Sequence, residues 1–397
     1  MDAPDIDELT PADRTLMGPG PSDVHPRVLR AMATPLVGYL DPSFVNVMND
    51  VQAGLRYLLQ TDNEHTLAVS GTGSAAMECA ISNLVEPGET VLVPDNGYFG
   101  QRMGEMATRA GGEVVSVGAP WGEPLAVADV EAAFADHQPR VVCLVHGETS
   151  TGVKQGHVDR IVDVAHEHDA YVIVDTVASL GGVEFHTDDW NVDVVYSGSQ
   201  KCLSAPPGAS PITFGERAVE KVHARETPSD SWYLDLEGLW SYWGDDPAYH
   251  HTGMTSTLYA AREALRLVAE EGIEQRWARH ERMAGALVAG VEAMGLSVLP
   301  AEADWLPSLN AVSLPPEADD GALTTTMLEE HDIEIAGGLG DLAGEIVRVG
   351  CMGHSARPSN VLSTVGALGR SLEAQGVDVD TGAGIAAANR ALDAERN

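Results

Sequence analysis

Lysine is almost absent from this chain. Among its 397 residues only Lys154, Lys201 and Lys221 are lysines, and 23 basic residues stand against 60 acidic ones. The resulting formal charge of −37 argues against binding to nucleic acid or to an anionic membrane, because phosphates would be repelled. Multimolar salt would screen the mutual repulsion of these acids within a few ångströms. We therefore expect a protein from a halophile, with an acidic mesophilic protein as the alternative.

Long apolar runs are missing as well. No run reaches the roughly 18 residues that a membrane-spanning helix needs, and residues 1–14 have neither the basic start nor the apolar stretch of a signal peptide. We therefore expect a cytoplasmic protein. Its length of 397 residues, of which 44% are hydrophobic, is sufficient for two domains.

The cysteines show no recurring spacing. There are four, and they form neither a CxxC pair nor a zinc-type pattern with histidines. The neighbouring His250 and His251 would point apart in a strand, and nothing near them in the sequence completes a metal site. We expect no metal, and such isolated cysteines are most often small buried hydrophobic residues.

Strand and helix patterns alternate along the first two thirds of the chain. The segments between the strand candidates have helical character, for example 74–86 and 158–168, and a further helix is expected over 41–60. This alternation predicts an α/β domain on a mostly parallel sheet with crossover helices. The strand candidates are residues 67–69, 90–94, 113–117, 141–146, 171–175 and 192–196.

The remaining third predicts a smaller α+β domain. A helix over 256–271 and a second one to about residue 294 precede strand candidates at 311–314, 333–336 and 346–349 and helix candidates at 322–331 and 360–373. We therefore divide the chain into an N-terminal arm at 1–22, a large α/β domain at 23–272 and a small domain at 273–397. The Ala- and Gly-rich end, 381–397, is expected to be a frayed helix or a loose tail.

Lys201 lies where an amine could act chemically. It follows the strand candidate 192–196 in the segment SGSQK, and the segment APPG at 205–208 interrupts regular structure soon after it. An amine on a stiff loop beside a buried strand is partly desolvated, which lowers its pKa and makes it nucleophilic toward an aldehyde. The alternatives are Schiff-base chemistry and an ordinary surface lysine.

Asp175 ends the strand candidate 171–175. A carboxylate at the C-terminal end of a parallel strand faces the crevice in which α/β proteins bind ligands. An enzyme that uses pyridoxal-5′-phosphate (PLP) needs such an anion against the pyridine nitrogen. A helix N-cap or a metal ligand would place an aspartate at the same point.

A glycine-containing turn, SGTGS at 70–74, follows the first strand candidate. It leads into a helix whose free N–H groups would attract a phosphate. A dinucleotide-binding loop is an alternative, because the relaxed fingerprint accepts Ala76 where the strict one needs glycine. An ordinary capped turn is another.

Two further residues are candidates for ligand contacts. Phe99 follows the strand candidate 90–94 and could stack on a planar ring, although such aromatics are more often core residues. Arg348 lies in an otherwise apolar strand and needs an anionic partner, either a substrate carboxylate or a structural ion pair.

Taken together, these segments resemble class V (fold-type I) PLP aminotransferases, in particular the alanine–glyoxylate and serine–pyruvate aminotransferase group. The similarity covers nearly the whole chain in the family's order, and SGSQK followed by APPG is its specific part. The matching stretches are LMGPGPS at 16–22, TPLVGYLDPSF at 34–44, SGTGSAAME at 70–78, NGYFGQR at 96–102, HGETSTG at 146–152, VDTVASLGG at 174–182, YSGSQKCLSAPPG at 196–208, YHHT at 249–252, IEIAGGLG at 333–340 and VRVGCMG at 347–353.

The resemblance implies PLP as the cofactor, bound by the large domain, and a homodimer with shared active sites. It implies that Lys201 carries PLP as a Schiff base and moves the substrate proton, and that Asp175 pairs with the pyridinium nitrogen. The implied cofactor contacts are Thr72, Gly73, Ser74 and Gln200 at the phosphate, Tyr249 and Thr252 from the partner subunit, Phe99 and Val177 on the ring faces, and Ser150 near the ring hydroxyl. The implied substrate contacts are Arg348 and Ser150 at the carboxylate, with Gly20 and Tyr39 lining the pocket.

Members of this group differ in substrate. Ser74 and Phe99 stand where the animal enzymes carry histidine and tryptophan, and Tyr249 stands where ureidoglycine–glyoxylate aminotransferases usually carry asparagine. We predict transamination between alanine or serine and glyoxylate or pyruvate. Small amino donors are expected because no second cation is evident to receive a side-chain carboxylate. Tyr249 makes alanine–glyoxylate the expected pair. Ureidoglycine–glyoxylate and serine–glyoxylate transamination are the alternatives.

Three other classes of protein stay open. A cysteine desulfurase or lyase would need a mobile, exposed cysteine, and Cys351 lacks a flexible loop around it. An NAD-dependent oxidoreductase would use the 70–74 turn but leave Lys201 without a role. A non-catalytic binding protein could share the fold.

Overall fold

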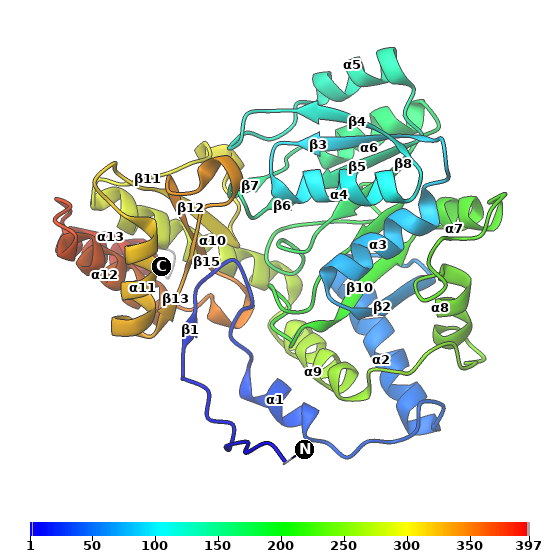
Figure 1. Cartoon of the computed structure of the whole chain (residues 1–397), viewed down its shortest axis with the longest axis horizontal. Coiled ribbons are helices and arrows are strands. Elements are labelled where there is room, and N and C mark those ends of the chain that lie inside the picture. Colours follow the sequence, from blue (N-terminus) through cyan, green and yellow to red (C-terminus); the bar gives the residue numbers. More distant parts are fainter. Residues whose placement is uncertain (2, 395–397) are drawn as a thin grey trace.

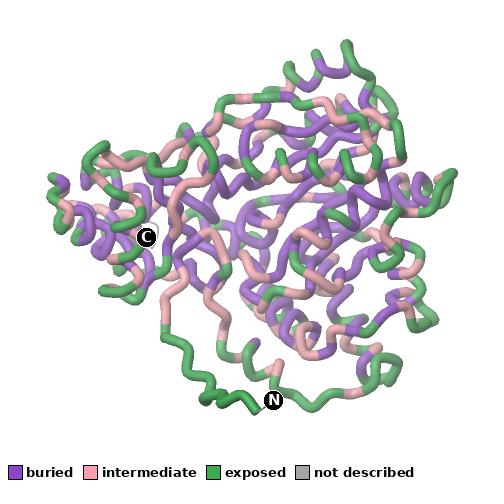
Figure 2. The backbone as a smooth tube through the Cα atoms, viewed as in Figure 1, coloured by how far each residue is buried: buried purple, intermediate pink, exposed green. Residues whose placement is uncertain are grey.

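The computed structural model describes residues 1 and 3–394 and shows two bodies of unequal size (Figure 1). The larger body is built on a seven-stranded sheet and the smaller one on a four-stranded sheet. Buried backbone is concentrated in the middle of both bodies, whereas the first residues of the chain are exposed along their length (Figure 2). No helix among the described residues combines the length and the apolar character needed to cross a membrane.

The seven-stranded sheet is mostly parallel, which confirms the predicted α/β class. Only one strand, β10, runs antiparallel to its two neighbours. The strand order is β2 (His65–Gly71), β10 (Gly208–Phe214), β9 (Val194–Tyr196), β8 (Tyr171–Asp175), β5 (Val141–Val145), β3 (Thr90–Asp95) and β4 (Glu113–Gly118). The sequence analysis missed β10, because Gly208 at its start and Pro211 in its middle are residues that disfavour a strand.

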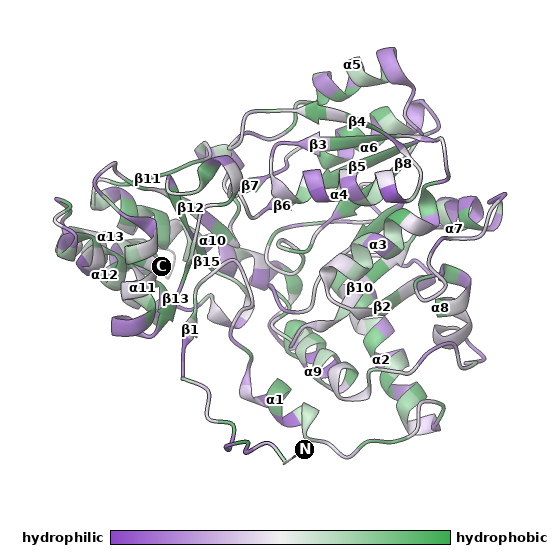
Figure 3. Ribbon diagram, in the orientation of Figure 1, coloured by the Kyte–Doolittle hydropathy of each residue, from purple (hydrophilic) through white to green (hydrophobic). Residues whose placement is uncertain are grey.

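The central strands are hydrophobic along their length, as Figure 3 shows. All five residues of β5 are buried, and so are Val172, Ile173 and Val174 of β8. Parallel strands covered on both faces need such apolar runs. The helices that follow the strands are α3 (Gly73–Leu84), α4 (Tyr98–Arg109), α5 (Val127–His137) and α6 (Val158–Glu167).

Two long helices complete the larger body beside β2 and β10. They are α2 (Pro42–Leu59) and α9 (Thr255–Glu271), which pack against each other. Asp41 caps α2 by accepting a hydrogen bond from the N–H of Ser43 at 2.7 Å, and Pro42 occupies the first helical position. The buried stripe of α2 includes Phe44, Met48 and Leu55, so the predicted helix over 41–60 is confirmed.

The smaller body has its own hydrophobic core, which includes Met283 and Leu287 of α10 (Ile273–Ala293). Its sheet has the order β11 (Ser297–Val298), β12 (Leu309–Ser313), β15 (Ile346–Gly350) and β14 (Ala336–Gly337). Its other helices are α11 (Asp320–His331), α12 (Pro358–Ala374) and α13 (Thr381–Ala394). The core of the larger body reaches Trp277, and a domain boundary at residue 272 stays a prediction.

The end of the chain forms a helix, as one of the two predicted alternatives has it, but this helix is packed rather than frayed. Residues 381–394 form α13, which packs on α10 and α12 with Ala388 and Leu392 buried. A Cβ atom on Gly290 of α10 would lie 3.2 Å from the Cβ of Ala388. The small residues therefore allow close helix packing rather than signalling disorder. The end of the predicted tail, 395–397, lies outside the described residues.

The N-terminal segment links the two bodies. The strand β1 (Thr15–Leu16) pairs with β13 (Ile333–Glu334), so the predicted strand over 333–336 divides into β13 and β14. Met17 is fully buried in the smaller core. The chain then turns toward the larger body, where Ser22 N–H donates to the Gln200 carbonyl at 2.9 Å. This crossing brings residues 18–22 against the Lys201 loop.

The other elements are short. They are α1 (Pro26–Met32), α7 (Glu216–His223), α8 (Leu236–Trp243), β6 (Gly147–Glu148) and β7 (Val153–Lys154).

Candidate active site

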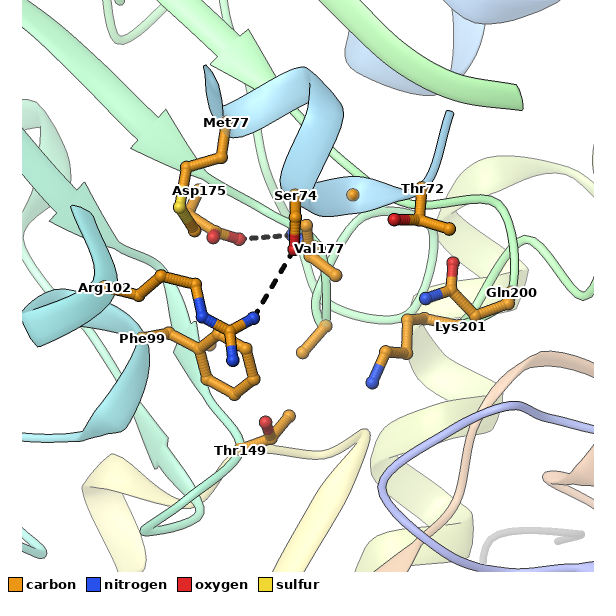
Figure 4. A pocket seen from close by; sticks show the side chains of 13 residues that line it. Thr72, Ser74, Met77, Phe99, Arg102, Thr149, Asp175, Val177, Gln200 and Lys201 are labelled. Atoms are coloured by element: carbon orange, nitrogen blue, oxygen red, sulfur yellow. Dashed lines mark hydrogen bonds between the residues drawn. The ribbon is translucent and has the colours of Figure 1, made fainter. Parts of the chain in front are cut away.

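A cavity of about 210 Å³ opens beside the carboxyl ends of β8 and β9 and the start of α3 (Figure 4). This is the edge of a parallel sheet at which α/β proteins bind ligands. The lining residues are Thr72, Gly73, Ser74, Met77, Phe99, Arg102, Gly147, Thr149, Asp175, Val177, Ala178, Gln200 and Lys201.

Lys201 extends its amine into this cavity (Figure 4). Burial lowers the pKa of this amine to about 8, and the nearby positive charge of Arg348 acts in the same direction. Its Nζ donates a hydrogen bond to the Pro19 carbonyl. Lys201 is therefore poised to lose its proton more easily than an exposed lysine.

Because Gly20 has no side chain, the end of the Lys201 side chain can lie directly against its backbone. A Cβ atom on Gly20 would lie 2.6 Å from Lys201 Nζ, and the φ angle of Gly20 is +117°. Both facts require glycine at this position. The structure thus places Gly20 against Lys201, and its predicted role in lining the substrate pocket stays a prediction.

Asp175 is held from two sides. Its Oδ1 accepts the Val177 N–H at 2.7 Å and its Oδ2 accepts the Tyr196 hydroxyl at 2.7 Å. Burial raises the pKa of Asp175 to about 6, and these two hydrogen bonds oppose the rise. The sequence analysis missed Tyr196, although Asp175 and Tyr196 lie opposite each other in the parallel β8–β9 pair.

The turn that precedes α3 is free to receive an anion. Thr72 occupies the N-cap position but makes no side-chain capping bond, and the N–H groups of Gly73 and Ser74 form no hydrogen bond within the described chain. Gln200 lines the same cavity, and its Oε1 is buried without a partner. Figure 4 shows the amide nitrogen of Gln200 directed toward the Lys201 side of the cavity, where it can donate to an anion. Free helix N–H groups with a nearby amide suit a phosphate.

Ser150 lies just behind the cavity wall, which its neighbour Thr149 lines. Its hydroxyl donates to Glu148 Oε1 at 2.7 Å and accepts the Tyr98 N–H at 3.0 Å. Its predicted contacts with the cofactor hydroxyl and the substrate carboxylate stay untested.

Glu148 organises this side of the site, and the sequence analysis gave it no role. It is 1% exposed, and its Oε2 accepts the Phe99 N–H at 2.9 Å. Burial raises the pKa of this carboxyl, while hydrogen bonds from Ser150, Phe99 and Gly100 lower it. Glu148 thereby holds the first turn of α4 and with it the position of Phe99.

Arg348 has no carboxylate partner among the described residues, although it is only 7% exposed. Its Nε donates to the Gly337 carbonyl at 2.8 Å and one terminal nitrogen donates to the Thr149 carbonyl at 3.3 Å. Burial lowers the pKa of Arg348, and the charge of Glu148 raises it. A buried guanidinium with donors to spare favours an anionic ligand.

Six predicted residues are not among those that line the cavity of this chain, namely Gly20, Ser150, Arg348, Tyr39, Tyr249 and Thr252. Tyr39 and Tyr249 are 38% and 58% exposed, with ring centroids 6.4 Å apart. The hydroxyls of Tyr249 and Thr252 lie 3.3 Å from each other. Their predicted roles, two of which involve a partner subunit, stay untested.

Arg102 is a cation in the cavity that the sequence analysis overlooked. It belongs to α4, three residues after Phe99, and its guanidinium carbon lies 4.9 Å from the Phe99 ring centroid. The cavity therefore contains a second cation, and whether it receives a side-chain carboxylate is not tested by the contacts. The helical spacing to Phe99 within NGYFGQR was the available signal.

Two other kinds of chemistry depend on metal-ligating residues or on a reactive cysteine thiol. The described residues contain no group of His, Cys, Asp and Glu arranged to hold a metal. All four cysteines are free and buried, and burial raises the pKa of the Cys351 thiol to about 12. A thiol of that kind is unreactive, which weighs against a desulfurase.

Comparisons with known proteins agree with this geometry. The family model "Aminotransferase class-V" matches residues 29–357. Alanine–glyoxylate aminotransferase of Drosophila melanogaster is 37% identical and covers 93% of this chain and 94% of its own. The crystal structure of alanine–glyoxylate aminotransferase from Nostoc sp. is 45% identical, with a TM-score of 0.91 and coverage of 93% and 97%. That of ureidoglycine–glyoxylate aminotransferase from Bacillus subtilis is 39% identical, with a TM-score of 0.95 and coverage of 98% and 100%.

Proposed function

Because this chain belongs to the class-V aminotransferases, an enzyme family that uses PLP, we propose that it transfers the amino group of alanine or serine to glyoxylate. Alanine–glyoxylate transamination is the expected main reaction. The observation that carries the proposal is the convergence in one cavity of the Lys201 amine, the Asp175 carboxylate and the open N-terminus of α3.

The residues present fit PLP. The side-chain NH₂ of Gln200 and the free N–H groups of Gly73 and Ser74 can donate to its phosphate, and Asp175 suits its ring nitrogen. Phe99 and Val177 offer apolar contact to its ring. When bound, PLP draws electrons from the substrate Cα and so makes the Cα–H bond acidic.

Asp175 and Lys201 divide the proton chemistry between them. Above a pH of about 6 Asp175 is a carboxylate, which holds a proton on the ring nitrogen, and the Tyr196 hydroxyl keeps this carboxylate oriented. The neutral amine of Lys201 can accept the substrate's Cα proton at Nζ and return it in the second half of the reaction. Its pKa of about 8 keeps a useful fraction neutral near pH 7.

Arg348 is the proposed partner of the substrate carboxylate. It is buried, lies near Lys201 and keeps unused N–H donors. A bidentate contact from a planar guanidinium would orient the substrate so that its Cα–H bond faces Lys201. The domain division at residue 272 would place Arg348 on the small domain and Lys201 on the large one.

Glyoxylate is the best supported acceptor. It appears in the names of the Drosophila, Nostoc and Bacillus relatives alike. Ureidoglycine is the second candidate donor, since the Bacillus subtilis (S)-ureidoglycine–glyoxylate transaminase is 38% identical over 96% of this chain.

We also propose a homodimer that works in the cytoplasm of a halophile. Exposed apolar residues such as Leu36, Leu40 and Trp232, which are 66%, 49% and 69% exposed, support a surface that a second copy covers. Four buried, unpaired cysteines suit a reducing compartment. Circular dichroism across a potassium chloride series tests the salt requirement, and a spectrum unchanged at low salt would remove it.

The visible spectrum of the purified protein in concentrated potassium chloride tests the proposed reaction. With PLP present we expect an absorption band that L-alanine or L-serine bleaches and glyoxylate restores. Bleaching by ureidoglycine but not by L-alanine would favour the second candidate. A protein that binds no PLP would overturn the proposal.

A further inference from the structure

Arg102 is the one lining residue whose charge the proposed reaction leaves without a use. The chain carries only 23 basic residues against 60 acidic ones, yet this arginine lies at a cavity rather than on the acidic surface. A cation held at a ligand pocket needs a reason, because an exposed position would allow it to pair with one of many carboxylates.

The guanidinium of Arg102 has donors to spare. One nitrogen makes a long contact of 3.4 Å with Ser74 Oγ, and no carboxylate forms an ion pair with it among the described residues. The group also lies over the rings of Phe99 and Tyr98, with centroid distances of 4.9 and 5.1 Å. Ring contacts use the face of a guanidinium and leave its edge N–H groups available.

The position of Arg102 indicates which anion these N–H groups would meet. Its contact is Ser74, the second residue of α3, where the unfilled N–H groups of the turn point. Arg348, by contrast, lies close enough to Lys201 to lower its pKa. The two arginines therefore lie near different residues of the site: Arg102 lies beside Ser74 (Figure 4) and close enough to Tyr196 for its charge to act there, and Arg348 lies near Lys201.

We infer that Arg102 binds the phosphate group of the cofactor from the α4 side, together with the N–H groups at the start of α3. This inference rests on the proposed function, because it takes PLP as the occupant. It also removes Arg102 as a receptor for a substrate side-chain carboxylate, which restores the preference for small, uncharged side chains on the amino donor.

The test compares two ligands that differ only in the phosphate. Apoprotein is titrated with PLP and with pyridoxal in the same concentrated potassium chloride, and binding is followed by absorbance. A charge-assisted hydrogen bond between guanidinium and phosphate is strong, so Arg102→Gln should weaken PLP binding by about 10- to 100-fold. The affinity for pyridoxal should fall much less, since only the packing of Phe99 changes.

Two further variants make the comparison specific. Arg102→Lys keeps the positive charge but not the planar fork, so it should retain part of the preference for PLP over pyridoxal. Arg109→Gln is the matched control, because Arg109 lies on the same helix with its side chain 80% exposed, and it should bind both ligands like the wild type. Apoprotein should also gain thermal stability from inorganic phosphate, and Arg102→Gln should lose this gain.

The outcomes separate the inference from the proposed function. If Arg102→Gln weakens PLP and pyridoxal equally, Arg102 acts only through Phe99 and the inference is wrong. If the ratio of the two affinities is unchanged but KM for a dicarboxylic amino acid such as aspartate rises, Arg102 binds substrate and the inference is again wrong. If the wild type binds neither ligand, the proposed function itself fails.

Discussion

The side of the cavity that carries Asp175 and Lys201 differs from the 244–254 loop, which carries Tyr249 and Thr252, in how firmly contacts within the chain hold its side chains. Asp175 ends the buried strand β8 and accepts hydrogen bonds from Val177 and Tyr196, and Lys201 lies in the loop that follows β9 and donates to the Pro19 carbonyl. Tyr249 is 58% exposed, and its hydroxyl contacts only Thr252 among the described residues. Contacts within one chain thus place Asp175 and Lys201 at the cavity, whereas such contacts leave Tyr249 exposed and outside the cavity lining.

Lys201→Ala should have the largest effect. Without the Nζ amine no group is placed to move the Cα proton, so transamination should fall by at least about 10⁴-fold. Steady-state assays with alanine and glyoxylate measure the loss, and gel filtration should show an unchanged assembly. Lys154→Ala is the control, since Lys154 lies in β7 outside the cavity lining. Full activity of Lys201→Ala would remove the assigned role.

Asp175→Asn should cost less, on the order of 10²-fold in kcat, because an amide cannot hold a proton on the pyridine nitrogen as a carboxylate does. Tyr196→Phe should show a smaller loss in the same direction, since it removes one hydrogen bond to Asp175. The exposed Asp163→Asn on α6 should change nothing. A wild-type kcat for Asp175→Asn would mean that the Asp175 carboxylate does not act on the ring nitrogen.

The pH dependence of cofactor attachment tests the lowered pKa of the Lys201 amine. Only the neutral amine attacks an aldehyde, and its fraction grows as pH rises toward the lowered pKa of about 8. The rate at which apoprotein reacts with PLP should therefore rise about tenfold per pH unit below pH 8 and level off above it. Stopped-flow absorbance gives this profile. A rise that continues to pH 10 would mean that Lys201 is hydrated like an ordinary lysine.

Changes in the loop should have the smallest effects. Tyr249→Phe and Thr252→Ala each remove one hydroxyl, so each should weaken PLP binding by about 3- to 10-fold and leave pyridoxal binding unchanged. The neighbouring Tyr233→Phe serves as the control. Equal binding of PLP by wild type and both variants, in an assembly of dimer size, would show that the loop does not reach the phosphate.

Strand periodicity and local motifs were enough to predict much of the fold. Continuous apolar residues predict buried parallel strands such as β5 and β8, and Asp41-Pro42 indicates the start of α2. The prediction failed at β10, where Pro211 lies in a buried strand, and it was right about a helix at α13 but wrong about its fraying, because glycine and alanine mediate helix packing there. In both cases packing against neighbouring elements, β2 and β9 for β10 and α10 and α12 for α13, outweighs the local conformational preference of proline, glycine or alanine.

The candidate site was predictable to the extent that a residue's neighbours in sequence determine its position. Lys201 and Asp175 follow from the ends of strands, and the phosphate turn follows from the start of α3. Tyr196, Glu148 and Arg102 were missed, because their roles depend on contacts with Asp175, Phe99 and Ser74. Such contacts join separate strands and helices, and no local pattern encodes them.

The sequence by itself therefore determined the α/β class and the family, and it identified Lys201 and Asp175 as candidate site residues. These depend on hydrophobic periodicity and on short motifs, which are local properties of a chain. Only the tertiary structure decided that Gly20 makes room for the Lys201 amine, that Arg348 is buried without a carboxylate and that Arg102 lies at the cavity beside Ser74. Burial, electrostatic fields and unfilled hydrogen bonds arise when distant segments pack together, so they exist only in the folded chain.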